Sequence, residues 1–555
     1  MSEAISPAAP AVNRPTRRQW LTLLVLSLGL AIVIIDGTIV NVAIPSIRAE
    51  FNATLQQLEW VNSIYALVYA ALIVTWGRIG DQIGRKLIFI IGVAAFVAGS
   101  LMAGAAPSIG FLILARVVQG LGAAMTSPST LSIVSATFTG RARGIAFGVW
   151  GAVAGASAAL GPLLGGWLTT NATWRWAFYI NLPIGIIAVA GAFLLIQESR
   201  DAGKRLTFDI PGILLTALGV GAITFALIEG QTYGWLQPKR PFALGNWTWP
   251  LEKVSISLVT AVIGLIALAI FVWWERRVKR QGKEPLFDFS LGRFASFRYG
   301  LITVAIVALG EFGVIFVLSL YLQGVLGLTA FQTGLVFLPF AVTTLFAAPT
   351  AGVLSSRFGA KWVVTSGMVI EAIAVFWLSR LFAVDTPIGY FVPVLILYGV
   401  GVGLAIAQLT NVVLSEVPRA SLGAGSGANN TIRQVGAAIG VAVIGAVLTT
   451  GITTSARSQL DANQTIPSFV KTAIVQQIEQ GGAAGEGQLS LEGAPPGIEK
   501  TEAGRAIGQI IQQSFVDGAR AAAVIASIFI LLGATSSLLI PNTKMQEIRE
   551  VAAAP

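Results

Sequence analysis

Long apolar segments separated by short polar stretches make up most of this chain. Each segment has about 20 residues or more, enough to cross the roughly 30 Å hydrocarbon core of a bilayer as a helix rising 1.5 Å per residue. The pattern therefore predicts fourteen membrane-spanning helices. They lie at 20–45, 57–77, 87–106, 110–135, 143–169, 175–197, 208–230, 254–275, 298–323, 333–354, 362–382, 388–414, 424–450 and 519–541.

The composition agrees with this pattern. Of the 555 residues, 55% are hydrophobic and only 11% are charged, whereas about a quarter of an average soluble domain is charged. We therefore expect an all-α integral membrane protein. The net charge of +10 would suit a nucleic-acid partner, but the basic residues lie in short loops between spans. That placement is the signature of membrane orientation, so no nucleic-acid partner is expected.

The chain contains neither cysteine nor histidine. Disulfides, zinc–thiolate sites, cysteine nucleophiles and Ser-His-Asp triads are therefore excluded, and we expect no metal site and no cofactor. Any proton that the protein carries across the membrane must be carried by a carboxylate instead of an imidazole.

The first residues are small and basic, and they lead into a long apolar span without a short signal-peptide core or cleavage site. We therefore expect an uncleaved first span in the cytoplasmic membrane, with cytoplasmic tails at 1–19 and 542–555. With an even number of spans, both termini lie on the same side. The basic stretch WERRVKRQGKEP at 274–285 then falls inside, as the positive-inside rule requires.

A short motif occurs twice. GRIGDQIGRK at 77–86 is matched by GVLSSRFGAK at 352–361, and both follow an apolar span on the predicted inner side. The repeat predicts two six-helix halves, at 20–197 and 298–541, separated by two inserted spans and a cytoplasmic linker at 198–297. Parallel six-span repeats are a transporter architecture. The copies differ where Asp81 and Arg85 are replaced by Ser356 and Ala360, which indicates a charged latch on one side only.

Six motifs occur in order, each on the span where one transporter family has it. Through them the chain resembles the major facilitator superfamily, in particular its 14-span drug:proton antiporters, and the resemblance covers nearly the whole chain. The motifs are IDGTIVNVAIP at 35–45, GRIGDQIGRK at 77–86, RVVQGLGAA at 116–124, GVWGAVAGASAALGPLLGGWL at 148–168, WRWAFYINLPIG at 174–185 and YLQGVLGLTAFQTGL at 321–335.

The resemblance implies roles for three groups of residues. In the family, the loop between spans 2 and 3 holds the two halves together on the inner side, and here its residues are Gly77, Asp81, Gly84, Arg85 and Lys86. The alternative is that these charges merely end the span at the interface. The first-span motif contributes Thr38, Asn41 and Pro45. The antiporter motif of span 5, which shapes the gate in the family, contributes Gly151, Gly155, Gly161, Pro162 and Gly165; ordinary close packing would need the same glycines.

Three ionisable residues, Asp36, Arg116 and Glu311, lie deep inside predicted spans, where charge is costly and usually functional. At 1.5 Å per residue they fall about 20 to 24 Å from the inner end, which predicts one shared polar layer. Asp36 is the candidate for proton coupling, because a proton and a cationic substrate would compete for its carboxylate. The alternative is a static Asp36–Arg116 pair that only fastens the spans. Glu311 is a second candidate for proton or substrate charge.

Further candidates are less defined. Arg433 lies inside span 13, where we expect a mainly structural pairing with an acid or with carbonyl groups, and Glu371 has no assigned role. The aromatic residues Trp60, Tyr65 and Phe312 are candidates to line a cavity and stack on flat cations. The segment 451–518 is expected to be a long outer loop whose flanks form short amphipathic helices and whose middle, 481–497, is flexible. Its flanks could rest on the membrane or contact an envelope partner.

These observations favour a secondary active multidrug exporter, with lipophilic, often cationic, small molecules, protons and membrane lipids as its partners. The alternative is a dedicated exporter of a lipid or of a metabolite or antibiotic made by the host, which would share every motif. We do not expect an enzyme, because no loop carries clustered catalytic acids. Nor do we expect an ATP-driven pump, because the sequence contains no G-x-x-x-x-G-K-[ST] motif.

Overall fold

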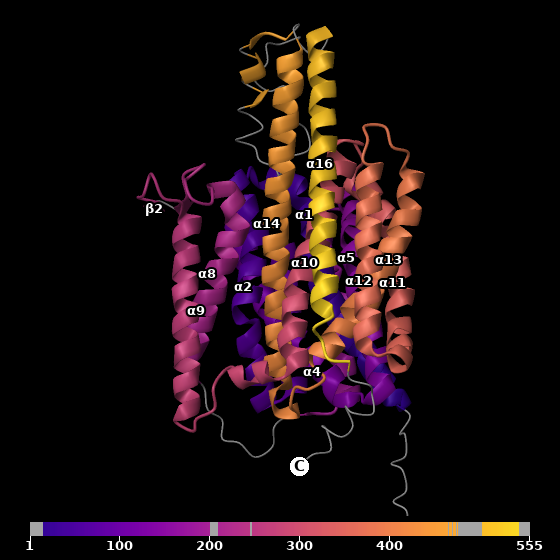
Figure 1. Cartoon of the computed structure of the whole chain (residues 1–555). Helices are drawn as coiled ribbons and strands as arrows, with labels where there is room; N and C mark the ends of the chain where they lie inside the picture. The colour runs from indigo at the N-terminus through magenta and orange to yellow at the C-terminus, as the bar shows by residue number, and fades with distance from the viewer. Residues whose placement is uncertain are drawn as a thin grey trace, which may run out of the picture.

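The protein is a bundle of long helices in a computed structural model (Figure 1). The structure describes residues 15–199, 209–244, 247–463, 466–468, 470–472, 474–475 and 502–542. Within this part, 14 helices are long and apolar enough to cross a membrane, which confirms the predicted fold class of a multi-pass all-α protein. We call the end where α1 (Arg17–Phe51) begins the lower end and the opposite end the upper end, as in Figure 1.

The first half is formed by the helices up to residue 195. α5 packs on α1, and α4 packs on both α2 and α3. The predicted sixth span is broken after Tyr179 into a short and a long helix. The bounds are α1 Arg17–Phe51, α2 Leu55–Ile83, α3 Arg85–Gly104, α4 Ile109–Thr137, α5 Gly140–Asn171, α6 Trp176–Tyr179 and α7 Asn181–Leu195.

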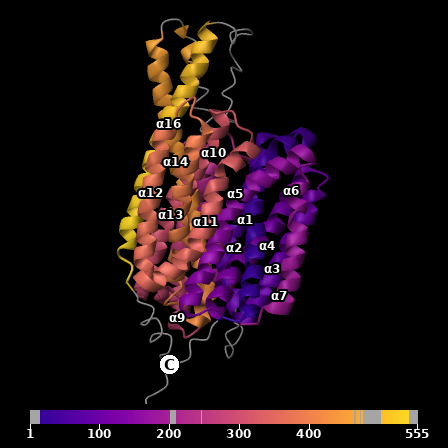
Figure 2. The same cartoon turned by 90° about the vertical axis from the view of Figure 1, so that its right-hand side faces the viewer.

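The second half repeats this arrangement, and Figure 2 shows the two halves side by side. They meet along two seams: α5 packs on α11 and α13 at one, and α2 and α4 pack on α14 at the other. Short 3₁₀ turns precede three of its helices: η1 at Phe289–Arg293, η2 at Ile388–Tyr390 and η3 at Arg419–Ser421. The helices are α10 Ala295–Gly324, α11 Ala330–Phe358, α12 Ala360–Leu381, α13 Phe391–Val413, α14 Leu422–Ala462 and α16 Glu502–Ser537.

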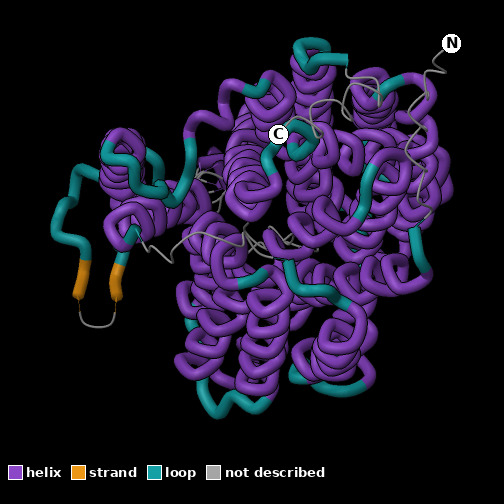
Figure 3. The backbone as a smooth tube through the Cα atoms, turned by 90° about the horizontal axis from the view of Figure 1, so that it is seen from below, coloured by secondary structure: helices purple, strands orange, loops and turns teal. Residues whose placement is uncertain are grey.

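The two inserted helices, α8 (Ile210–Tyr233) and α9 (Ile256–Arg280), pack on each other at one edge of the bundle (Figure 3). Two short antiparallel strands, β1 (Ala243–Leu244) and β2 (Trp247–Thr248), lie in their upper connection. α8 contacts both α2 and α14, and Gln231 donates a 2.9 Å hydrogen bond to the Val441 carbonyl of α14. The insertion therefore bridges one of the two seams between the halves.

The repeat is visible in how equivalent helices begin and end. α2 begins with a capping box made by Thr54 and Gln57, and α11, 275 residues later, begins with the same box made by Thr329 and Gln332. The two helices end at Gly84 and Gly359, whose φ angles of 141° and 89° lie where side chains are disfavoured. The chain thus turns directly into the next helix in both halves.

The segment 451–518 differs from the expected loop. α14 has 41 residues and α16 has 36, so each is about 55 to 60 Å long, and Figure 1 shows them rising together above the other helices. Ile452, Ala456 and Leu460 are buried in one core cluster with Ile507 and other residues of α16. The predicted helix at 507–515 is present, but as part of α16 and not as a short separate helix. The prediction of a loop was wrong at 451–462 and in the rest of 502–518, because apolar residues there repeat at helical spacing and pair the two helices. The predicted flexible middle lies outside the described residues.

Candidate functional site

An ion pair between Asp36 and Arg116 lies inside the first half. Asp36 is on α1 and Arg116 is on α4, and the Arg116 guanidinium contacts the Asp36 carboxylate directly. The side chains of both residues are almost completely buried, with 0% and 1% of their surfaces exposed. Because a lone charge in the bilayer interior is strongly disfavoured, each residue provides the counter-charge that the other needs.

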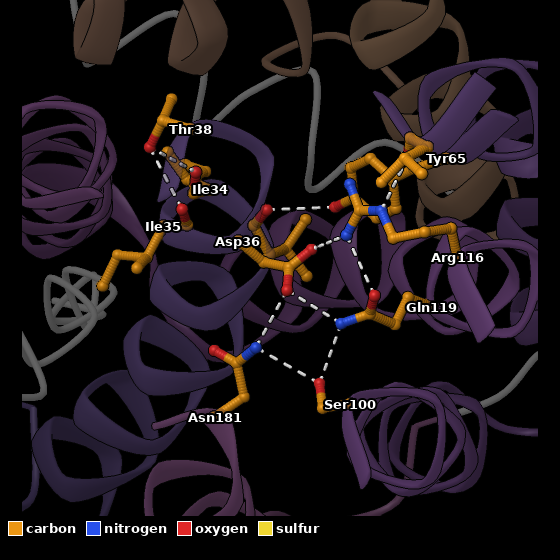
Figure 4. A network of polar contacts seen from close by, with 11 residues as sticks. Ile34, Ile35, Asp36, Thr38, Tyr65, Ser100, Arg116, Gln119 and Asn181 are labelled. Atoms are coloured by element: carbon orange, nitrogen blue, oxygen red, sulfur yellow. Dashed lines mark hydrogen bonds and ion pairs between the residues drawn. The ribbon is translucent and has the colours of Figure 1, made fainter. Parts of the chain in front are cut away.

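Three further polar side chains complete this group (Figure 4). Gln119 and Asn181 donate hydrogen bonds of 2.8 and 2.9 Å to the same oxygen of Asp36, and both also donate to the Ser100 hydroxyl, at 2.9 and 3.2 Å. Arg116 donates to the Gln119 side-chain oxygen at 2.9 Å. Asp36 therefore receives three donors in a buried interior. We call these five residues the Asp36 centre.

Local structure explains how the three additional residues come to Asp36. Gln119 follows Arg116 by three residues, so both point from the same face of α4. The break between α6 and α7 places Asn181 at the first turn of α7. Ser100 is on α3, which packs against α4. The sequence analysis did not single out these residues, although the i, i+3 spacing from Arg116 was a usable signal for Gln119.

Tyr65 of α2 packs against this group from the side. Its hydroxyl donates to the Val33 carbonyl at 3.0 Å, and the Arg116 guanidinium lies 4.3 Å from its ring centroid, a cation–π distance. Arg116 also donates to the Val61 carbonyl at 3.0 Å. The structure therefore places Tyr65 in the packed interior of the first half, instead of on a cavity wall as predicted.

The other two candidate aromatic residues lie elsewhere. Trp60 packs against Phe225 of the inserted helix α8, with ring centroids 6.1 Å apart, so it contacts the insertion and not the Asp36 centre. Phe312 on α10 is 38% exposed. Its role as a cavity residue stays a prediction.

Glu311 does not join Asp36 and Arg116. It lies on α10 in the second half, where its carboxylate is 3.8 Å from the Arg433 guanidinium of α14. The prediction of one polar layer formed by Asp36, Arg116 and Glu311 was therefore wrong in its grouping: each half has its own arginine–carboxylate pair. Depth along a helix fixes the height of a residue but not the direction in which it points, so a sequence-based depth could not separate the two groups.

At the lower end, Asp81 bridges the two halves. It lies on the last turns of α2 and accepts hydrogen bonds from the backbone N–H groups of Gly423 and Ala424, at 2.8 and 3.1 Å. Both N–H groups belong to the first turn of α14, where unpaired backbone N–H groups and the helix dipole stabilise a carboxylate. Arg85 forms a 2.8 Å ion pair with Asp81 and donates to the Arg419 carbonyl. The predicted latch residues Asp81 and Arg85 therefore both contact the opposite half.

Two other members of the motif have different neighbours. A side chain at Gly77 would collide with the Gly423 carbonyl, so Gly77 permits the approach of α2 to α14. Lys86 instead donates to the Phe193 carbonyl near the end of α7, at 2.9 Å, within its own half. Its repeat mate Lys361 donates in the same way to Leu538, just past the end of α16, at 2.6 Å. The placement of Lys86 in an inter-half latch was therefore wrong: both lysines neutralise a helix C-terminus inside one half.

The antiporter motif on α5 presents glycines to two different partners. A Cβ at Gly151 would lie 3.1 Å from Ala407 of α13, and one at Gly155 would lie 2.7 Å from Thr344 of α11. Both contacts reach the second half. A Cβ at Gly165 would lie 2.8 Å from Ile39 of α1, and a Cβ at Gly161 would overlap Thr38. Pro162 sits between them inside the helix, in a part of α5 that packs on both α1 and α11.

The first-span motif at 35–45 takes part in the contact between α1 and α5. Thr38 faces Gly161 and donates to the Ile35 carbonyl at 3.1 Å. Asn41, one turn further, accepts a 2.8 Å hydrogen bond from Asn62 of α2, and Pro45 lies inside α1. The motif therefore fastens α1 to α5 and α2 directly above the Asp36 centre.

Replacing Gly161 with alanine is expected to destabilise the protein by about 1–3 kcal/mol, because the new methyl group overlaps the Thr38 hydroxyl in a packed interface. Thermal unfolding of the purified protein measures the loss. A second change, Thr38→Ala, should restore part of the stability. Gly110→Ala on α4 is the matched control, because a Cβ there meets no atom within 4 Å. Equal melting temperatures for Gly161→Ala and Gly110→Ala would contradict the packing argument.

The fold and the buried polar groups define a class: membrane proteins of two repeated six-helix halves, each with charged residues in its interior. The chain belongs to the Major Facilitator Superfamily, whose sequence profile matches residues 26–211 and 211–441. It is thus a member of a transporter family.

Individual relatives agree with this assignment. The chain is 33% identical to the multidrug resistance protein Stp of Mycobacterium tuberculosis, over 83% of this chain and 81% of that protein. It is 28% identical to the tetracenomycin C resistance and export protein of Streptomyces glaucescens, over 98% and 95%. Its fold is similar to the crystal structure of the human organic anion transporter MFSD10, with a TM-score of 0.55, 12% identity and 94% and 99% coverage.

Proposed function

We propose that this protein exports lipophilic, often cationic, small molecules across the cytoplasmic membrane in exchange for protons. The observation that carries the proposal is the buried Asp36–Arg116 pair in the interior of a transporter half. In a chain without histidine, a buried carboxylate is the group that can take up and release a proton in this part of the membrane. The names of the relatives, which refer to drug resistance and export, support the substrate class.

The contacts around Asp36 suggest how a proton would act. Protonation removes the negative charge that holds Arg116, while the bonds from Gln119 and Asn181 can persist on a neutral carboxyl oxygen. Arg116 is then a buried cation without a counter-ion, which favours a rearrangement that brings it to water. In the ionised state Asp36 would attract a cationic substrate. Proton and substrate therefore compete for one group, which produces antiport.

The orientation is part of the proposal. Arg277, Lys279 and Arg280 occupy the last turn of α9 at the lower end, so the positive-inside rule places this end, with both tails, in the cytoplasm. The bonds from Asp81 to α14 then close the cytoplasmic side in the present state. When they break, the halves can tilt to open this side, as alternating access requires.

Ethidium efflux from pump-deficient bacteria that express the protein tests the function. Cells energised with a carbon source are expected to expel the dye, and a protonophore is expected to stop this efflux because it removes the proton gradient. Efflux that continues in the protonophore would disprove proton coupling. Cells with the empty vector provide the baseline, and a membrane fraction blot confirms that the protein is present.

The second candidate function is export of one metabolite made by the host. It is favoured by the near full-length similarity to a relative named for a single antibiotic, tetracenomycin C. A protein present in the membrane that expels neither ethidium nor tetraphenylphosphonium would favour this alternative. Comparing the compounds retained by host cells with and without the gene would then identify the class of the metabolite.

Contact of the helical extension of α14 and α16 with an envelope partner stays a prediction.

A further inference from the structure

A second group of buried ionisable residues lies in the second half, and only part of it was anticipated. Glu371 sits near the middle of α12, about 16 Å from either end of that helix. None of its surface is exposed, and neither carboxylate oxygen has a hydrogen-bond partner among the described residues. A carboxyl group without a partner in the bilayer interior is costly if it is ionised. Its presence therefore needs an explanation beyond packing.

The neighbours of Glu371 come from three other helices. It interacts electrostatically with Glu311 of α10 and Arg433 of α14, and both carboxylates also act on Tyr398 of α13. The Tyr398 hydroxyl and one Glu311 oxygen likewise lack partners in the described part of the chain. These unpaired polar atoms therefore all belong to helices of the second half that act on one another electrostatically.

Other charged groups on the helices that pack against α12 lie far from Glu371. On α16, Asp517 and Arg520 are 3.8 Å apart, and Arg520 donates to the Phe382 carbonyl just past the upper end of α12. Arg357 of α11 is exposed at the lower end. A Cβ at Gly401 of α13 would lie 2.7 Å from the backbone nitrogen of Glu371, so the helices are tightly packed there.

Charge counting then decides the protonation state. Two glutamates and one arginine would leave one uncompensated negative charge if all three were ionised. Glu311 is the acid that pairs with Arg433, at 3.8 Å, and both side chains are mostly buried. Glu371 has no such partner atom among the described residues, so it is the glutamate whose negative charge would remain uncompensated. A proton on its carboxyl group removes this charge.

We propose that Glu371 and Glu311 form a proton-binding site in the second half, with the proton on Glu371 and the charge of Glu311 balanced by Arg433, and that transport exchanges this proton. The exchange rests on the proposed function, whereas the bound proton does not. The two halves then each contain a carboxyl group that can be protonated, Asp36 in the first and Glu371 in the second.

Infrared spectroscopy of the purified full-length protein tests the bound proton without any substrate. The wild type at neutral pH should show a protonated-carboxyl absorption that Glu371→Gln lacks. Glu311→Gln should also reduce this absorption, because Arg433 is then available to pair with an ionised Glu371. Glu50→Gln, which alters an exposed acid paired with Arg175, is the control and should keep it. An unchanged absorption in Glu371→Gln would overturn the proposal.

Proteoliposomes with ethidium as the probe test the exchange. Each coupled proton contributes a factor of ten to the attainable substrate gradient per unit of pH difference. At an imposed difference of one unit, Glu371→Gln should therefore reach a gradient about tenfold smaller than the wild type. An equal gradient would show that the proton is fixed and would overturn the exchange. If the wild type itself makes no pH-driven gradient, the proposed antiport and the exchange both fail, while the infrared result still decides whether the proton is bound.

Discussion

Replacing Asp36 with asparagine is expected to reduce pH-driven export to the rate of protein-free liposomes. Asparagine has nearly the same size and can still accept from Gln119 and Asn181, but it cannot take up a proton. It also leaves Arg116 buried without a counter-charge, which costs about 3–5 kcal/mol and favours states in which Arg116 is hydrated. Ethidium uptake into inverted proteoliposomes under an imposed pH difference measures the effect.

Two further variants separate proton coupling from a purely structural pair. Glu50→Gln makes the same chemical change on the same helix, at an exposed acid that pairs with Arg175, and should leave export near the wild-type rate. The double variant Asp36→Asn with Arg116→Gln removes both buried charges at once, so it should fold better than the single variant. If this neutral pair still supported pH-driven export, Asp36 would be a fastener of helices and the coupling role would be wrong.

The sequence predicted the helices well because lipid imposes a simple rule: a spanning segment must be helical and apolar over about 20 residues. It predicted less well where helices continue past the membrane. The apolar positions of Ile452, Ala456 and Leu460 repeat at helical spacing, but hydropathy over a span-length window gives such a stretch little weight. The extension of α14 and α16 was therefore interpreted as a loop.

Only part of the candidate site could be predicted, because hydropathy marks charged residues within a span more clearly than neutral polar ones. Charged residues within spans, such as Asp36, Arg116 and Glu311, stand out in an apolar sequence. Neutral polar residues such as Gln119 and Asn181 do not. Pairing depends on the direction in which each helix face points, and this follows from packing between helices far apart in the chain. The sequence could therefore identify the charged members of both groups, but it could not assign Glu311 and Glu371 to the second half's own group.

Comparison of the two repeats separates the residues of the motif at 77–86 that act within one half from those that contact the other half. Lys86 and Lys361 perform the same task in their respective halves, so this part of the motif serves folding of each half. Asp81 has no charged counterpart, because Ser356 occupies the equivalent position, and its hydroxyl donates to the Val353 carbonyl of its own helix. The asymmetric residue is the one that crosses to the other half, which is where a conformational change must act.

Replacing Asp81 with asparagine is therefore expected to open the lower end. The carboxylate makes charge-assisted bonds to two N–H groups of α14 and to Arg85, and hydrogen bonds to a charged group contribute about 1.5–3 kcal/mol. The ratio of open to closed molecules should rise about ten- to a hundredfold. Because the chain has no cysteine, spin labels can be placed at Arg141→Cys and Arg298→Cys, at the lower ends of α5 and α10, without altering other sites. Double electron–electron resonance spectroscopy then measures the distance between the two spin labels, one in each half.

The controls follow from the repeat. Ser356→Ala changes the equivalent position in the second half and should leave the distance distribution unchanged, because the Ser356 hydroxyl bonds within its own helix. Lys86→Met removes a charge from the same motif, and should lower thermal stability by about 1 kcal/mol or less without opening the lower end. An Asp81→Asn distribution identical to that of the wild type would show that the bonds to Gly423 and Ala424 do not set the closed state. A shift of equal size in Lys86→Met would show that the motif acts through general charge and not through the crossing of Asp81 to α14.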